Sequence, residues 1–426
     1  MLKTPKSLRL QIGLFGRVNV GKSTFLNYVS SQEVSITSPH PGTTTDVVEK
    51  TMELLPVGPV VFLDTAGLDD VSVLSKLRLK KTRKIFERSD IFVLLTEPGI
   101  WGEYEKRIKE ESLARNIPLI VVINKIDVKK LDEAFVKQVN SYSQHIIICS
   151  SLDKGGRDEV IYQFKQHLIE VCPADFVNPP AIIGDLVPAG GSAVLIVPID
   201  LEAPKGRIIL PQVQAIRDLL DNDAAALVVK EREYKPLLDN LKRPPDIVVC
   251  DSQVVMKMAA DTPPAVKCTT FSILFSRYKG NLTEAVKAVA AIDNLKPRDR
   301  VLIAEACSHH PIEDDIGRVK IPRWLRQYVG GDLKIDTYAG RDYPDNLKEY
   351  KLIIHCGGCM IGRREMLSRI NRAKESGVPI TNYGLCISFL HGVIERVLSP
   401  FPAALDILKR QKQVKKAGEA YADESD

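Results

Sequence analysis

The stretch LQIGLFGRVNVGKST, residues 10–24, decides the fold class of this chain. Its apolar run LQIGLF leads directly into the glycine-rich GRVNVGKS, and a helical pattern follows. A strand, a glycine-rich loop and a helix in this order are typical of a phosphate-binding loop, whose amides and helix N-terminus hold phosphate oxygens. Gly16 and Gly21 let the backbone turn towards the phosphates, Lys22 neutralises them, and Ser23 offers its hydroxyl to Mg²⁺.

Alternating strand and helix patterns extend outward from this loop, over residues 8 to about 172. Five apolar runs predict strands: LQIGLF, PVVFLD, DIFVLL, IPLIVVIN and HIIICS. Helical segments between most of them predict βαβ units and a mostly parallel sheet that is covered on both faces. The stretch CPADFVNPP at 172–180 carries three prolines, which predicts a linker.

The pattern restarts after the linker. VLIVPI, ALVV and DIVVC predict strands of a second block, and RVLIAEAC and KLIIHC predict strands of a third. The break DTPPAVK at 261–267 separates the two blocks, and the polar end of the chain is expected to fray. We therefore predict three α/β domains, the first a P-loop fold with a mostly parallel sheet, followed by a polar tail. The expected boundaries are 1–173, 180–264, 265–403 and 404–426.

Composition limits the class of protein further. The chain has 426 residues, of which 44% are hydrophobic and 27% charged, and this excludes a disordered, collagen-like or coiled-coil protein. A net charge of +5 gives no strong argument for a nucleic-acid partner. No run of 18 apolar residues occurs, so we expect a cytoplasmic protein without a membrane partner. Eight cysteines are too few for a disulfide scaffold, so clustered ones indicate metal or redox chemistry.

Two further motifs indicate a guanine nucleotide. DTAG begins at Asp64, whose carboxylate is expected beside Mg²⁺ and its water ligands. The amide of Gly67 in the same motif can sense the γ-phosphate. NKID ends at Asp127, whose carboxylate can accept hydrogen bonds from guanine N1–H and N2–H₂, a donor pair that adenine lacks. Asn124 and Lys125 would brace this loop, and the SSL segment after the next strand can offer an amide to guanine O6.

With these four motifs in order, residues 8–172 resemble a translation-factor-type GTPase domain of the tRNA-modification and ribosome-assembly branch. The resemblance implies GTP and Mg²⁺ as ligands. It implies Mg²⁺ ligation by Ser23, Thr44 and Asp64. It implies catalytic roles for Asn19, Lys22, Thr44 and Gly67. The implied nucleotide-binding residues are Gly16, Asn19, Val20, Gly21, Lys22, Ser23, Thr24, Asp64, Gly67, Asn124, Lys125, Asp127, Ser150 and Ser151.

Two departures bear on the hydrolysis rate. Leu68 stands where related enzymes carry a water-orienting glutamine, which predicts slow hydrolysis. Asn19 resembles the potassium-coordinating asparagine of cation-activated GTPases, so K⁺ is a candidate cofactor, and an ordinary loop role is the alternative. The loop PGTTTD resembles the first switch. We expect Thr44 as its Mg²⁺ ligand, with Thr43 and Thr45 as alternatives.

Three cysteines form a separate pattern. Cys307 ends a predicted strand, and Cys356 and Cys359 follow another in the sequence HCGGCM. If these strands are parallel neighbours, all three thiols emerge at the carboxyl edge of one sheet, where ligands of open α/β folds bind. Thiolates are soft ligands that suit iron–sulfur clusters, Zn²⁺ or Cu(I).

The pattern C-x-H followed by H-C-x-x-C, together with the GTPase motifs, resembles the FeFe-hydrogenase maturation GTPases over the whole chain. The resemblance implies a 4Fe–4S cluster on Cys307, Cys356 and Cys359 and a homodimer formed through the middle domain. It implies a scaffold or carrier that holds the di-iron precursor of the hydrogenase active site. The implied partners are two radical SAM maturases and the apo-hydrogenase.

The fourth iron of such a cluster lacks a cysteine in this pattern. Histidines and acidic residues near the motif can either ligate it or hydrogen-bond the loops as supporting groups. The candidates are His309, His310, His355, Glu313, Asp314 and Asp315.

Two other function classes remain open on the sequence. The GTPase motifs alone would fit an RNA- or ribosome-associated GTPase, but no GXXG loop or concentrated basic domain follows them. Three cysteines and a histidine would also fit a zinc-binding GTPase metallochaperone.

Overall fold

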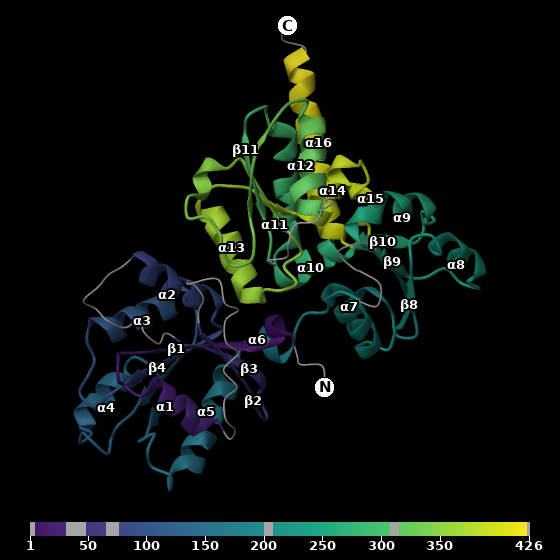
Figure 1. Ribbon diagram of the computed structural model, residues 1–426. Coiled ribbons are helices and arrows are strands. Elements are labelled where there is room, and N and C mark those ends of the chain that lie inside the picture. The colour runs from purple at the N-terminus through teal and green to yellow at the C-terminus, as the bar shows by residue number, and fades with distance from the viewer. Residues whose placement is uncertain (1–4, 31–47, 65–75, 200–207, 307–314, 424–426) are drawn as a thin grey trace. The chain divides into compact units, whose positions relative to one another are not determined.

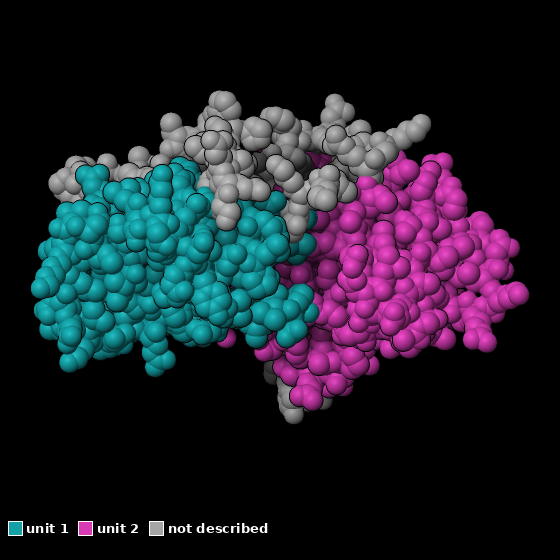
Figure 2. All heavy atoms as spheres, turned by 90° about the horizontal axis from the view of Figure 1, so that it is seen from below, with its two compact units in different colours: residues 1–179 teal, residues 180–426 magenta. Residues whose placement is uncertain are grey.

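The computed structural model describes residues 5–30, 48–64, 76–199, 208–306 and 315–423 (Figure 1). The chain divides into two compact units, Met1–Pro179 and Pro180–Asp426 (Figure 2). The division falls within the proline-rich stretch that the sequence predicts as a linker. Parallel strands and helices build both units, so the α/β class is confirmed.

The first unit contains a six-stranded sheet in the order β2-β3-β1-β4-β5-β6. Among the described strands of this sheet, β2 alone is antiparallel to its neighbour, and the other pairs are parallel. The predicted P-loop architecture is therefore confirmed. The strands are β1 (Leu10–Gly16), β2 (Val48–Leu54), β3 (Gly58–Asp64), β4 (Ile91–Thr96), β5 (Leu119–Ile123) and β6 (Ile146–Ile148).

Helices cover both faces of this sheet, which explains why its central strands are continuous apolar runs. On one face Phe25 and Phe164 meet edge to face, with ring centroids 5.5 Å apart. On the other face Phe15 packs on Phe86 and Phe92. The first face carries α1 (Lys22–Val29) and α5 (Arg157–Val171), and the second carries α2 (Lys76–Arg88), α3 (Glu103–Ala114) and α4 (Glu133–Asn140). The short η1 (Lys6–Leu8) and α6 (Ala174–Val177) complete the unit.

The second unit contains two parallel sheets of four strands each, in the orders β10-β9-β7-β8 and β12-β11-β13-β14. One apolar core passes through both sheets and joins the two expected domains into one unit. The strands of the first sheet are β7 (Ser192–Ile196), β8 (Ala225–Val229), β9 (Ile247–Cys250) and β10 (Lys267–Thr270). Those of the second are β11 (Arg300–Ala304), β12 (Lys334–Tyr338), β13 (Leu352–His355) and β14 (Ile380–Asn382).

Helices surround these two sheets. The α-helices are α7 (Leu210–Asp221), α8 (Tyr234–Asn240), α9 (Val255–Asp261), α10 (Phe271–Lys279), α11 (Leu282–Val289), α12 (Ile321–Val329), α13 (Arg363–Glu375), α14 (Tyr383–Leu390), α15 (Ile394–Val397) and α16 (Pro402–Asp423). A π-helical turn, η5 (Ile316–Lys320), precedes α12. Short 3₁₀ turns are η2 (Gly184–Leu186), η3 (Ser252–Val254), η4 (Ile292–Asn294) and η6 (Leu347–Glu349).

The structure differs from the expected boundaries at two places. The boundary at 264/265 is too early, because β10 pairs in parallel with β9 and belongs to the second sheet rather than to the third block. The expected frayed tail at 404–426 is helical from Pro402 as far as the described residues extend. Ala404 and Leu408 lie one turn apart and are buried, which anchors the start of α16. Within the described residues, no helix combines the length and hydropathy that crossing a bilayer requires.

Candidate nucleotide and metal-cluster sites

The phosphate loop connects the end of β1 to the start of α1. Lys22 is buried, and its Nζ donates to the carbonyls of Gly16 (2.6 Å) and Arg17 (3.0 Å). Gly21 has a left-handed φ of 94°, and a Cβ there would lie 2.5 Å from Asn124 Nδ2. A side chain is therefore excluded at this position by both backbone strain and a neighbouring motif.

An ion pair that the sequence analysis missed fixes the loop to α3. Arg17 donates Nε and Nη2 to the two carboxylate oxygens of Glu105, at 2.7 and 2.8 Å. Glu105 also accepts from the amide of Gly102, and Gly16 N donates to Tyr104 Oη. Burial alone would raise the pKa of Glu105, but the bonds from Arg17 and Gly102 outweigh it and lower the pKa.

Asn124 joins three of the predicted motifs. Its side chain is 2% exposed, and Nδ2 donates to the carbonyl of Val20 in the phosphate loop at 2.9 Å. Its Oδ1 accepts from the amide and the hydroxyl of Ser151, at 3.0 and 2.9 Å. The loops that follow β1, β5 and β6 therefore meet at the carboxyl edge of the sheet, which is the edge where α/β folds bind ligands.

The structure also describes the other residues of the NKID and SSL motifs. Lys125 has a left-handed φ of 61°, and its Nζ lies 2.8 Å from Glu97 Oε1. Asp127 is exposed, so its carboxylate is accessible to a base. Ser150 is buried, and its hydroxyl accepts from the amide of Leu152.

The expected Mg²⁺ and catalytic residues are described in part. Asp64 ends β3, is 3% exposed, and lies 3.9 Å from Lys50 Nζ. Ser23 and Thr24 are exposed in the first turn of α1, and Asn19 is exposed with a left-handed φ of 64°. Thr43, Thr44, Thr45, Gly67 and Leu68 lie outside the described residues.

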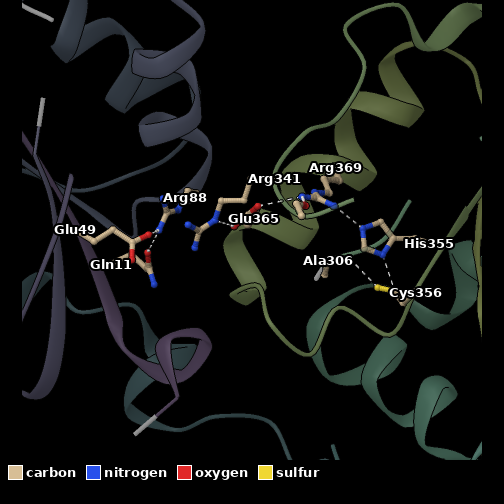
Figure 3. A network of polar contacts seen from close by, with 10 residues as sticks. Gln11, Glu49, Arg88, Ala306, Arg341, His355, Cys356, Glu365 and Arg369 are labelled. Carbon is tan, nitrogen blue, oxygen red and sulfur yellow. Dashed lines mark hydrogen bonds and ion pairs between the residues drawn. The ribbon is translucent and has the colours of Figure 1, made fainter. Parts of the chain in front are cut away.

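The cysteine edge, by which we mean the carboxyl edge of the sheet that is followed by Cys356 and Cys359, is built from neighbouring strands. β11 and β13 pair in parallel, with Ala304 opposite His355, so the condition placed on these strands is met. The amide of Ala306 donates to Cys356 Sγ at 3.1 Å (Figure 3). Cys307 lies outside the described residues. In the sequence it directly follows Ala306, whose amide makes this contact.

Cys356 and Cys359 share a short loop after β13. Gly358 between them has a φ of 66°, and a Cβ there would lie 2.6 Å from Met366 Cε. Burial raises the pKa of Cys356 to about 11. Burial also raises the pKa of Cys359, and the charge of Lys279 opposes that shift without reversing it. A bound cation removes such thiol protons outright. Two soft donors on a glycine-bearing loop, with an amide aimed at one sulfur, fit an iron–sulfur or other thiophilic centre.

Lys279 supports this loop and has no signature in the sequence. Its side chain is 1% exposed, at the end of α10. Nζ donates to the carbonyls of Gly358 (2.9 Å), Cys359 (3.0 Å) and Ile361 (2.7 Å). Burial lowers the pKa of Lys279 to about 8, while Cys359 and Cys356 oppose that shift. The ammonium group therefore fixes the backbone on both sides of the second cysteine.

Both ring nitrogens of His355 are engaged (Figure 3). Nδ1 lies 2.7 Å from the carbonyl of Cys356, and Arg369 Nη1 donates to Nε2 at 3.0 Å. Burial and the charge of Arg369 lower the pKa of His355 to about 3, so the ring is neutral and Nδ1 carries the proton. Arg369 is in turn held by Glu365 at 3.2 Å. Of the two alternatives for His355, these contacts favour the supporting one.

The acidic candidates near Cys307 are described only in part. Asp315 is buried and caps η5, because its Oδ1 accepts from the amide of Arg318 at 2.8 Å. Glu305, which the sequence analysis did not single out, is 2% exposed and contacts Arg318 Nη2 at 3.2 Å and Tyr383 Oη at 3.4 Å. His309, His310, Glu313 and Asp314 lie outside the described residues.

Curated relatives match part of the chain. The tRNA modification GTPase MnmE of Prochlorococcus marinus (strain NATL1A) is 35% identical over 169 residues, which are 38% of this chain and 34% of that protein. GTPase Der of Wolinella succinogenes is 29% identical over 170 residues, 38% of this chain and 36% of that protein. The chain thus spans about a third of the length of these relatives. Among solved structures, a variant of Aquifex aeolicus Era bound to GDP·AlF4⁻ is 25% identical to this chain. The match covers 38% of this chain and 56% of the Era chain, with a TM-score of 0.31.

Three family models cover the chain in order. The model described as 50S ribosome-binding GTPase matches residues 11–125, so the first unit contains a GTPase domain, which supports binding of GTP with Mg²⁺ and GTP hydrolysis. The Hydrogen maturase F dimerization domain matches 182–280, and the Hydrogen maturase F tetramerization domain matches 283–400. The second unit therefore carries two domains that support oligomerisation, and the boundary between their models lies close to residue 281. The sequence predicts a homodimer, and the tetramerization model adds a second oligomerisation domain to the one for dimerization. With both of its specific domains present behind a GTPase domain, the chain belongs to the hydrogen maturase F family of hydrogenase maturation GTPases.

Proposed function

We propose that this protein holds a 4Fe–4S cluster on Cys307, Cys356 and Cys359 and carries the di-iron precursor of the FeFe-hydrogenase active site to the apo-hydrogenase. The contact that carries the proposal is the hydrogen bond from the Ala306 amide to Cys356 Sγ, at 3.1 Å. Ala306 directly precedes Cys307 in the sequence, and this bond holds its amide against the first sulfur of the C-x-x-C loop. Amide donors to cluster sulfurs are one way in which proteins stabilise iron–sulfur centres.

The surrounding side chains support a prearranged loop. Lys279 binds three of its carbonyls, and His355 binds the carbonyl of Cys356 while Arg369 holds the ring. A bound cluster would supply a site at one iron where a second metal unit can attach. A fourth ligand that is not a cysteine suits this role, because carboxylates and imidazoles on iron exchange more readily than thiolates. His309, His310, Glu313 and Asp314 stay candidates for it.

GTP acts in this proposal as a switch for partner binding rather than as a source of energy for cluster chemistry. The nucleotide residues and the cysteines belong to different units, which favours control through loops that order around the γ-phosphate. The partners proposed are two radical SAM maturases and the apo-hydrogenase. Equal partner affinity with GDP and with a non-hydrolysable GTP analogue would contradict this part.

Slow hydrolysis stimulated by K⁺ is a further part of the proposal. Asn19 is exposed and has the left-handed backbone that turns the phosphate loop, so its side chain is accessible to a cation. A K⁺ ion there would supply positive charge near the β,γ-bridging oxygen. Hydrolysis measured in KCl and in NaCl at equal ionic strength tests this, and equal rates would discard the role of K⁺.

The central test is purification without oxygen, followed by iron, sulfide and zinc analysis and by EPR of the reduced protein. We expect about four irons per chain in the wild type and loss of the brown chromophore in Cys356→Ser and Cys359→Ser. Cys386→Ser, which alters a buried cysteine of the same unit, is the matched control and should keep the cluster. Zinc in place of iron in protein made with ample iron would favour a zinc metallochaperone and overturn the proposal.

A further inference from the structure

Two histidines and a glutamate converge in the GTPase domain, away from the residues used above. His145 directly precedes β6, and His167 and Glu170 lie one turn apart near the end of α5. The two Nδ1 atoms are 3.3 Å apart. Glu170 Oε2 lies 3.3 Å from Nδ1 of His145 and 3.1 Å from Nδ1 of His167. Three atoms that can each bind a metal ion therefore form a nearly equilateral triangle.

The size of this triangle fits one class of ion. A tetrahedral ion with metal–nitrogen and metal–oxygen distances of about 2.0–2.1 Å separates its ligand atoms by roughly 3.3 Å. All three edges agree with this value to within about 0.2 Å. Two imidazoles and one carboxylate favour a divalent first-row transition ion, whereas Mg²⁺ and Ca²⁺ prefer sites made of oxygen alone.

The environment of the triangle is open enough for an ion to enter. The side chains of His145 and His167 are 29% and 22% exposed, and that of Glu170 is 55% exposed. The two rings stand at 73° to one another, so they approach the shared point from different sides rather than stacking.

We propose that His145, His167 and Glu170 form a binding site for a divalent transition-metal ion, with Zn²⁺ as its best match, and that the ion links α5 to β6. His145 lies at the amino end of β6, whereas Ser150 and Ser151 follow its carboxyl end. The ion would therefore lie at the edge of the sheet opposite the nucleotide, and its role would be to fix α5 rather than to act on GTP. The donor set contains no sulfur, which distinguishes this site from the cysteine edge.

Equilibrium dialysis of the full-length, anaerobically purified protein against low micromolar Zn²⁺ tests the site, with bound zinc measured by mass spectrometry. We expect His145→Ala, His167→Ala and Glu170→Gln each to lose one zinc per chain or to bind it at least tenfold more weakly. Gln163→Ala, one turn before His167 in α5, is the matched control and should bind as the wild type does. GTP hydrolysis and metal-free thermal unfolding should be the same in all variants, which separates metal loss from misfolding.

Zinc-edge X-ray absorption of the loaded protein gives a second readout. The expected first shell contains nitrogen and oxygen at about 2.0–2.1 Å with imidazole scattering beyond it, and a sulfur shell at about 2.3 Å would instead place the zinc on cysteines. Absence of bound zinc in the wild type or unchanged binding in the three variants would each overturn the proposal, and so would a first shell of sulfur without nitrogen or oxygen. All proteins are compared at equal iron content, because cysteines that lack a cluster also bind Zn²⁺.

Discussion

Lys279 places an ammonium group against three carbonyls of the loop that carries Cys356 and Cys359. Lys279→Met keeps the length of the side chain but removes the donor. A buried carbonyl without a partner costs about 1–3 kcal/mol, so the loop should lose its fixed conformation. We expect iron and sulfide content to fall by at least half, with a broadened EPR signal of the reduced protein.

Lys257→Met is the control for this prediction. Lys257 is an exposed helical lysine whose ion pair with Asp261 is of the surface type that contributes little to stability. It should leave cluster content unchanged. A Lys279→Met protein with full iron content and a wild-type EPR spectrum would show that the loop does not need this ammonium group.

Asn124 is the residue on which the nucleotide loops depend most directly. Asn124→Ala leaves the Val20 carbonyl and the Ser151 amide without their present partner, and this side chain is 2% exposed. Loss of the two bonds corresponds to about 1.4 kcal/mol or more, which is at least a tenfold loss of GTP affinity. Titration with a fluorescent GTP analogue measures it. Asn140→Ala, at the exposed end of α4, should bind normally, and equal affinities in the two variants would refute the bracing role.

At the scale of single elements, the ion pair between Arg17 and Glu105 connects α3 to the phosphate loop and makes stability depend on pH. The pKa of Glu105 is lowered in the folded protein, so the carboxylate stabilises the fold fully above its usual value of 4.5. The contribution disappears as the pH falls through the folded pKa. Glu105→Gln should therefore cost about 1–3 kcal/mol near pH 7 and progressively less below pH 4.5.

Urea unfolding between pH 7 and pH 3 measures this effect. A Trp324→Phe background leaves Trp101 as the sole tryptophan, so fluorescence follows the first unit alone. Glu103→Gln is the matched control, since Glu103 lies in the same turn of α3 but its side chain is 94% exposed. Parallel pH profiles for wild type and Glu105→Gln would mean that the ion pair contributes nothing to stability.

The elements also show which parts of the fold a sequence reveals. β4 and β5 are buried along their whole length, and their apolar runs predicted them. β2, β10, β12 and β14 were not predicted, and each of them lies at an edge of its sheet: β2 and β12 are partly exposed, and β10 and β14 have four and three residues. An edge strand carries a weak apolar pattern because one side of it lacks a neighbour.

The candidate sites divide in the same way. Motif residues such as Lys22 and Asn124 could be found because phosphate and guanine binding demand fixed residue types at fixed local spacing. The contacts of Arg17 with Glu105 and of Lys279 with the cysteine loop join residues about 80 to 90 positions apart, and no local pattern records them. Such supporting groups become visible only when the strands have been placed side by side.

At the scale of the whole molecule, the described cores divide the chain into two separately stabilised units. Two apolar clusters consist only of residues before Pro179, and the three others consist only of residues after Pro180. Burial of apolar surface is the main source of stability, so a cut between these prolines removes little of it. Residues 1–179 expressed alone should fold and bind GTP with an affinity within about threefold of the full chain.

The complementary fragment, residues 180–426, should keep the oligomeric state of the full protein, because both oligomerisation domains lie within it. Sedimentation velocity of the full chain and of both fragments measures this, with residues 1–179 expected to be monomeric. A monomeric second fragment, or an unfolded first one, would show that the units depend on each other for stability. If both fragments fold alone, they can be mixed at low concentration without a covalent link. Any effect of GTP on the loop of Cys356 and Cys359 must then vanish. The reason is that the covalent connection no longer holds the GTPase domain near the second unit.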